Sequence, residues 1–354
     1  MNRQTIIDYV MNDPSDTNRA ILMDLLKRLD GVPNGKFSVE DVANYVMYTK
    51  NNTNRAVLDT MLRSLNNEHP IRNKRTVLYA DGTFIINESA KDIEKNVQLH
   101  GEMLNEYPPL DEEHPYAWEG QQYRYWANEI EQIKFAKFGS PVKPTSMRAW
   151  FAYCTELESF DTTNLDTSEC TLLNMLFAGT SGSDLTKLKS LDLSSFNTSK
   201  VTSMKQMFYR CTALETLNIS SFDTSNVETM EQMFGNCSSL TELDVSHFNT
   251  SSVERMAGMF NNCSSLTELD VSNFDTSNVT NMSSIFNSCF TLTTIYASDS
   301  FVVEQVLSDG NMFANDTSLV GGAGTTYVNT TTGKGKTYAR IDNPPDVPGY
   351  FTAK

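Results

Sequence analysis

The residues of this sequence that could carry out chemistry are few and dispersed. Four of the six cysteines, at positions 211, 237, 263 and 289, lie 26 residues apart, and no two cysteines form a Cys-x-x-Cys pair. The four histidines do not cluster near them, so neither the spacing nor the residue types predict a zinc site. We therefore expect no metal and no other cofactor.

An active site is not predicted either. Catalysis requires a nucleophile, a base and a stabilising group in one cleft, or a metal with an open coordination position. The sequence has no Gly-x-Ser-x-Gly, His-Glu-x-x-His, Walker or dinucleotide-binding motif. Paired carboxylates do occur, but they recur along the chain with the period of the cysteines. The sequence therefore predicts a protein that binds and is not an enzyme.

The carboxylates form columns when the chain is aligned on its 26-residue period. One column reads Ser190, Thr216, Glu242, Glu268 and Thr294, and a second reads Asp192, Asn218, Asp244, Asp270 and Tyr296. The candidate binding face consists of Glu242, Asp244, Glu268, Asp270, Asn218 and Tyr296. Stacked like charges repel each other, which favours a face for a polar or basic partner. The alternative is a solvated sheet face that only prevents aggregation.

A repeat must position these columns. Apolar residues recur in register with the cysteines, as in Phe208, Phe234, Phe260 and Phe286. Residues 241–246 alternate in polarity like a short strand. A short apolar helix face is predicted by the spacing of Val227, Met230, Met233 and Phe234. About seven such units over residues 141–320 predict an α/β leucine-rich-repeat solenoid, since one unit cannot bury its apolar face alone.

Two polar columns have alternative interpretations. Stacking would bring the cysteines near disulfide distance, but Thr180 and Asp316 occupy the same place in other units, which favours a buried core column. An Asp/Asn column consists of Asn197, Asp223, Asn249 and Asp275. Its position in a turn favours capping hydrogen bonds over calcium binding.

The repeated segment LDVSNFDTSNVTNMSSIF at 269–286 resembles the 26-residue leucine-rich repeats of BspA-like bacterial surface proteins. The resemblance includes YADGTFIINE at 79–88, FGSPVKPTSMRAWFAYC at 138–154 and TYARIDNPPDVPGYFT at 337–352, so it covers about residues 76–354. It implies a right-handed solenoid that adheres to cells, matrix or other surfaces. The secretion signal and wall anchor usual in that family are not visible in this sequence.

A second repeat, of 36 residues, occupies the start of the sequence, where residues 8–29 align with residues 44–65. It predicts a small all-α module of two helical hairpins with capped second helices. The candidate docking residues are Ile21, Leu22, Leu25, Val57, Leu58 and Met61. This module resembles N-terminal segments of phage structural proteins such as head fibres, which implies attachment to other virion structural proteins.

The predicted domains follow from these repeats. They are a docking module at 1–70, a β-hairpin and irregular cap at 71–140, the solenoid at 141–320 and a C-terminal cap at 321–354. The hairpin is predicted by Asp81-Gly82 between the apolar segments 76–80 and 83–86.

Composition limits the partners. The formal net charge of −16 disfavours nucleic acid and anionic lipid, and no apolar run is long enough to span a membrane. We expect a phage virion surface protein, a head fibre or decoration-type adhesin, whose solenoid binds a host-surface protein or glycan. The alternatives are a bacterial cell-surface adhesin and an intracellular scaffold, and a homo-oligomer stays open.

Overall fold

The computed structural model describes residues 74–89, 103–107, 130–139, 141–330, 334–343 and 347–354, together with seven single positions between residues 6 and 46. Two compact units divide the chain: Met1–Arg75 with Glu88–Lys95, and Thr76–Asn87 with Asn96–Lys354. The regular elements are β1 (Lys74–Tyr79), β2 (Thr83–Ser89), β3 (Met103–Tyr107), η1 (Ile130–Gln132), β4 (Phe135–Phe138), β5 (Ser159–Phe160), β6 (Ser190–Asp192), β7 (Thr216–Asn218), β8 (Glu268–Asp270), β9 (Thr294–Ala297), η2 (Lys336–Tyr338) and β10 (Phe351–Ala353).

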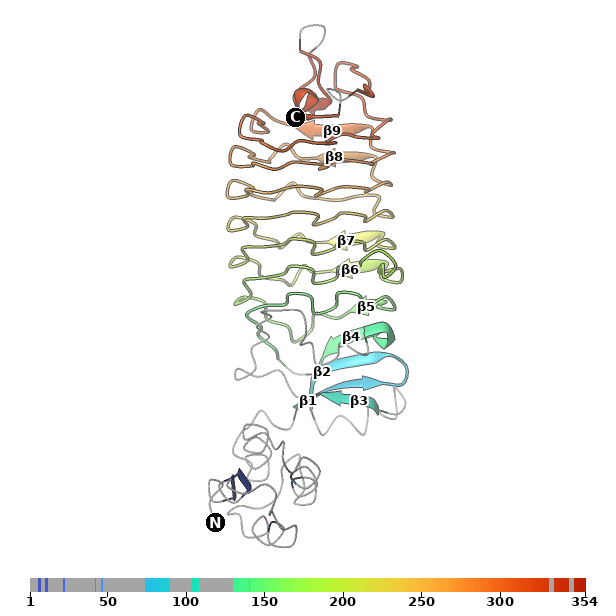
Figure 1. The fold of residues 1–354 in the computed structure, drawn as a ribbon, viewed down its shortest axis with the longest axis vertical. Coiled ribbons are helices and arrows are strands. Elements are labelled where there is room, and N and C mark those ends of the chain that lie inside the picture. The colour runs from blue at the N-terminus through green and yellow to red at the C-terminus, as the bar shows by residue number, and fades with distance from the viewer. Residues whose placement is uncertain are drawn as a thin grey trace. The chain divides into compact units, whose positions relative to one another are not determined.

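The strands form three sheets (Figure 1). The first has the order β3-β1-β2-β4-β5, the second β10-β9-β8 and the third β6-β7. β1 and β3 are antiparallel, whereas β2-β4, β4-β5, β6-β7, β8-β9 and β9-β10 are parallel. Between β1 and β2 lies the predicted hairpin turn, in which Gly82 N donates to Tyr79 O at 2.9 Å and Gly82 has a φ of +89°. A left-handed φ of this kind favours glycine.

From β4 onward the chain forms stacked coils, which Figure 1 shows one after another along the second unit. Each coil bonds to the next one 25 or 26 residues further on: Phe208 N donates to Met233 O, and Phe234 N donates to Met259 O, both at 2.9 Å. A second seam of parallel bridges joins Ser203, Thr229, Arg255, Asn281 and Ser308. The backbone of one coil is therefore satisfied mainly by its neighbours.

The core consists of columns of identical side chains from successive coils. The rings of Phe208, Phe234, Phe260 and Phe286 stack with centroid distances of 5.6 to 5.9 Å and interplanar angles of 2 to 9°. These rings and the methionines of the neighbouring column are fully buried. The apolar columns read from the sequence are thus the core of this unit.

A column of buried threonines also joins the coils. Thr198, Thr224 and Thr250 each donate from Oγ1, at 2.8 Å, to a backbone carbonyl 25 residues further on. The neighbouring Asn/Asp column accepts hydrogen bonds within its own turn, as Asp223 Oδ1 does from Ser225 N at 3.0 Å. This agrees with the capping interpretation of that column. The threonine column was not predicted.

All six cysteines are free and buried. The Sγ atoms of Cys211, Cys237, Cys263 and Cys289 each lie 3.1 to 3.2 Å from a phenylalanine carbonyl and donate to it. Burial holds the pKa of these thiols well above the ordinary value of a cysteine. The cysteine column is therefore part of the core.

The predicted α/β class is wrong. Among the described residues of the coils there is no α-helix, and the segment expected to be helical, from Val227 to Phe234, contains an isolated β-bridge at Thr229 followed by turns. Met233 N donates to Met230 O within the turn, but Gln232 N donates to Ala257 O of the next coil at 2.8 Å. Gln232 and Asn236 have left-handed φ values of 54° and 62°, and these interrupt any helix. The described part of the second unit consists of short strands, turns and the two 3-10 helices η1 and η2.

The predicted all-α N-terminal module also requires correction. The seven described positions of residues 1–70 are all α-helical, but neither the ends of these helices nor their pairing into hairpins lie within the described residues. The fold class of two helical hairpins is therefore not retained. Of the candidate docking residues, Leu22 is buried. The other five lie outside the described residues: Ile21, Leu25, Val57, Leu58 and Met61.

Candidate functional site

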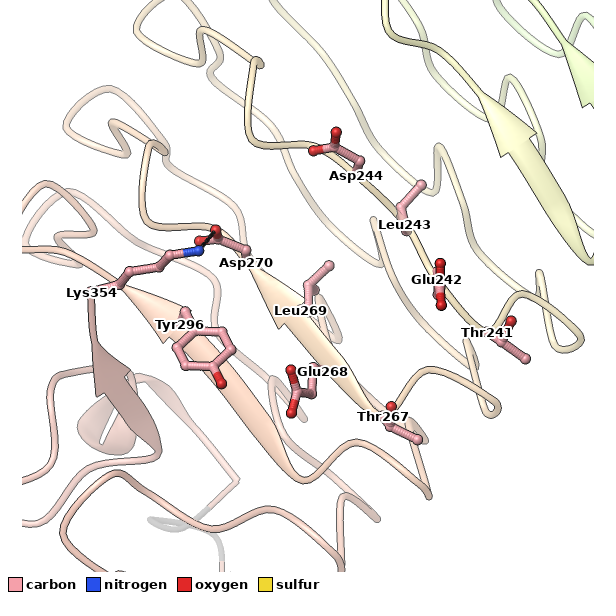
Figure 2. Close-up of a pocket in the computed structure, with 10 residues that line it drawn as sticks. All are labelled: Thr241, Glu242, Leu243, Asp244, Thr267, Glu268, Leu269, Asp270, Tyr296 and Lys354. Atoms are coloured by element: carbon pink, nitrogen blue, oxygen red, sulfur yellow. Dashed lines mark hydrogen bonds and ion pairs between the residues drawn. The ribbon is translucent and has the colours of Figure 1, made fainter.

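An open groove of about 410 Å³ lies between the coils that carry Glu242 and Glu268 (Figure 2). Five of the six candidate binding residues line it, namely Glu242, Asp244, Glu268, Asp270 and Tyr296. The other lining residues are Thr241, Leu243, Thr267, Leu269 and Lys354. Asn218 is exposed at the end of β7 and is not among the lining residues.

One wall of the groove is a regular ladder. β8 pairs in parallel with β9, so that Glu268 is next to Thr294 and Asp270 is next to Tyr296. Leu269 between them is buried in the core. This alternation, which is normal for a strand, places both acidic residues of β8 on the outer side.

The opposite wall has no ladder. The strand predicted at 241–246 is absent, and within this described stretch no backbone hydrogen bond joins residues 241–244 to either neighbouring coil. A ladder toward β8 would place Glu242 beside Glu268 and Asp244 beside Asp270, and directly opposed like charges are destabilising. In the β6-β7 ladder the corresponding pairs are Ser190 with Thr216 and Asp192 with Asn218. The groove thus lies between the two adjacent coils in which both columns are acidic.

The four carboxylates of the groove differ in what they contact. Asp244 Oδ1 accepts from Ser246 N at 3.0 Å and from Ser246 Oγ at 2.6 Å, and these bonds lower its pKa. Asp270 Oδ1 accepts from Ser272 N at 3.0 Å. By contrast, Glu242 and Glu268 are exposed, and neither has a hydrogen bond or ion pair in this described region. The carboxylates of Glu242 and Glu268 are therefore the ones in the groove that are available to a ligand.

Lys354 is a groove residue that the sequence did not reveal. Its Nζ donates to Asp270 Oδ2 and lies 5.4 Å from the centroid of the Tyr296 ring. It is brought there by β10, which pairs in parallel with β9 through Phe351 and Ile295. The bond to Asp270 raises the pKa of Lys354. Lys354 lies outside the repeats, so no column of the alignment could place it beside Asp270.

The region around the groove has a large excess of negative charge. Residues 211–299 contain eleven Asp and Glu residues and one basic residue, Arg255, so this segment has a formal charge of −10, or −9 when Lys354 is added to it. Acids outside this segment also have basic partners, as in the Lys143–Asp166 pair at 3.2 Å. The groove is thus suited to a cationic ligand.

In the described ranges, no group of three or more His, Cys, Asp and Glu side chains is placed to hold a metal ion. Among the same residues, no helix combines the length and apolar character that crossing a bilayer requires.

The coils and the groove define a repeat protein whose similar units present a polar outer face. The family described as "Mycoplasma protein of unknown function, DUF285" matches residues 145–243 and 215–324, which together span 180 of 354 residues. The chain belongs to this family. The match is consistent with the resemblance to BspA-like repeat proteins. No curated protein matches the sequence.

Proposed function

We propose that this protein is a non-catalytic binding protein that displays the groove between residues 241–244 and β8 to a partner on a host or environmental surface. The observation that carries the proposal is the pair of exposed, uncommitted glutamates, Glu242 and Glu268, within a region of formal charge −10. Neighbouring carboxylates without basic partners repel each other, and this cost favours a binding role over solubility alone. The excess charge would also steer a basic partner toward it.

Binding to cells tests this function. We expect the fluorescently labelled full chain to bind saturably to at least one member of a panel of Gram-positive bacterial cells. The double variant Glu242→Gln/Glu268→Gln should bind about tenfold more weakly, because it removes two charges from the contact. Flow cytometry at low ionic strength would measure both. Absence of saturable binding to every member, or equal binding of the variant, would contradict the proposal.

The matched control is Glu228→Gln/Glu254→Gln. These two glutamates are exposed and belong to adjacent coils, since Glu254 N donates to Glu228 O at 2.9 Å, but they do not line the groove. The control therefore removes the same charge from a different part of the same coils. Its binding should stay close to that of the unaltered chain.

The location of this display is proposed from the N-terminal repeat. The aligned segments 8–29 and 44–65 support attachment to other virion structural proteins, with the bacterial cell surface as the alternative. We expect mass spectrometry of purified phage particles from a producing culture to detect the chain at a fixed ratio to the major capsid protein. Its absence from particles would reject the virion location and leave the binding function to be tested separately.

A further inference from the structure

The spacing of the four carboxylates in the groove limits the ligand more closely than their negative charge alone does. The four carboxylates form two pairs, with Glu242 and Glu268 at one end and Asp244 and Asp270 at the other (Figure 2). Within each coil the two acids are separated by one leucine, Leu243 or Leu269. Residues i and i+2 of an extended chain lie about 6.6 Å apart and point to the same side. The two acidic pairs should have this separation.

The groove already contains one cation. The ammonium group of Lys354 donates to Asp270, and its position near the ring of Tyr296 allows a cation–π contact. Lys354 is supplied by β10 and reaches the aspartate end of the groove from the side opposite residues 241–244. The chain therefore shows, with its own residue, how a primary amine is held there. The glutamate end has no such occupant.

The floor of the groove suits the stem of a long basic side chain. Leu243 is only half-buried, so it presents apolar surface between Glu242 and Asp244, whereas Leu269 faces the core. Lysine and arginine cover such surface with their methylene groups while the charged end reaches polar partners. A small inorganic cation would not use this floor.

We propose that the groove binds an extended peptide segment that carries two basic residues separated by one residue. One basic side chain contacts Glu242 and Glu268, and the other contacts Asp244 and Asp270 in competition with Lys354. The segment lies parallel to the coils, and its intervening residue points away from the groove. This inference rests on the proposed binding function and names the partner's chemistry.

The test compares two fluorescein-labelled peptides of equal composition, Gly-Ser-Lys-Ser-Lys-Ser-Gly and Gly-Ser-Lys-Ser-Ser-Lys-Gly, by fluorescence anisotropy with the full chain at low salt. We expect the first to bind at least fivefold more tightly, because only its lysines have the i, i+2 spacing. Glu242→Gln/Glu268→Gln should weaken its binding about tenfold. Glu228→Gln/Glu254→Gln should leave its affinity nearly unchanged.

A third variant, Lys354→Met, distinguishes binding of the peptide in the groove from general electrostatic attraction to the acidic surface. It removes the competing amine, so the affinity for the first peptide should increase severalfold, beyond the increase that the same variant gives for the second peptide. Equal affinity for the two peptides would overturn the inference. If neither peptide binds but the chain still binds cells through the glutamates, the basic-peptide ligand is wrong and the proposed function stands. If both assays fail, the proposed function fails as well.

Discussion

Phe260→Ala is expected to lower the free energy of unfolding by about 3–5 kcal/mol, the usual cost of emptying a buried phenylalanine site. The ring of Phe260 is fully buried and stacks between Phe234 and Phe286, at centroid distances of 5.9 and 5.8 Å. Its backbone is held on the next coil, because its N–H donates to Ile285 O at 2.9 Å. The surrounding rings therefore cannot collapse easily into the cavity. Urea denaturation followed by circular dichroism would measure the loss.

The matched control is Phe290→Ala, which removes the same side chain from a position that is 48% exposed. Most surface substitutions change stability by less than about 0.5 kcal/mol, so this variant should unfold close to the unaltered chain. Similar losses for the two variants would show that the stacked ring column is not the main source of stability.

Asp316→Asn is expected to stabilise the protein above neutral pH. Asp316 occupies the cysteine column in the last coil and is fully buried. Its Oδ1 accepts from Cys289 N at 2.9 Å, while its Oδ2 has no hydrogen-bond partner within the described residues. Burial raises the pKa of this carboxyl to about 8. An asparagine keeps the accepting oxygen and is never ionised.

The sign of the pH dependence follows from these values. The pKa of Asp316 is about 8 in the folded chain and near the ordinary 3.8 in the unfolded chain. Between these values the unfolded chain binds fewer protons at this group, so the contribution of Asp316 to stability is most favourable below pH 4, falls as the pH rises toward 8 and then levels off. Each pKa unit corresponds to about 1.4 kcal/mol, so the variant should be several kcal/mol more stable at pH 8.5 than the unaltered chain, with a much smaller difference at pH 4.

Denaturation of both proteins at pH 4, 6 and 8.5 would measure this difference. The control is Asp275→Asn, which alters an aspartate whose pKa is lowered by hydrogen bonds from Ser277. Its carboxylate stabilises the fold above pH 4, so its replacement should give no gain at pH 8.5. If the stability difference between the Asp316→Asn variant and the unaltered chain did not change with pH, the pKa of the buried Asp316 carboxyl would not be raised as described.

The core could be predicted from the sequence because the repeat shows which positions stay apolar from one unit to the next. A position that is apolar in every unit, such as the column of Phe234 and Phe260, is buried in every coil. The local conformation could not be predicted in the same way. The spacing of Val227, Met230 and Met233 fits a helix, but turns of three residues give the same spacing, and the left-handed φ of Gln232 has no sequence signal comparable to glycine.

The groove was predicted in part. The acidic columns indicated which residues share a face, and Glu242, Asp244, Glu268, Asp270 and Tyr296 do line one groove. Asn218 belongs to the alignment column of Asp244 and Asp270, but it lies on β7 and does not line the groove. Alignment shows which residues stack but not where a ladder is interrupted, and that interruption depends on the backbone of residues 241–244. Lys354 could not be found, because its position depends on how the C-terminal cap returns to β9.

The threonine column has a consequence for how such proteins vary. Thr224 bonds to the carbonyl of the following coil in the same way as Thr250 does, so each internal coil meets equivalent neighbours on both sides. Gain or loss of one whole 26-residue repeat would keep the threonine hydrogen bonds at the new junction and change the length of the stack by one strand spacing, about 4.8 Å. Unequal recombination between the segments that encode these repeats can therefore change the length of the stack in small steps while this column of hydrogen bonds is kept.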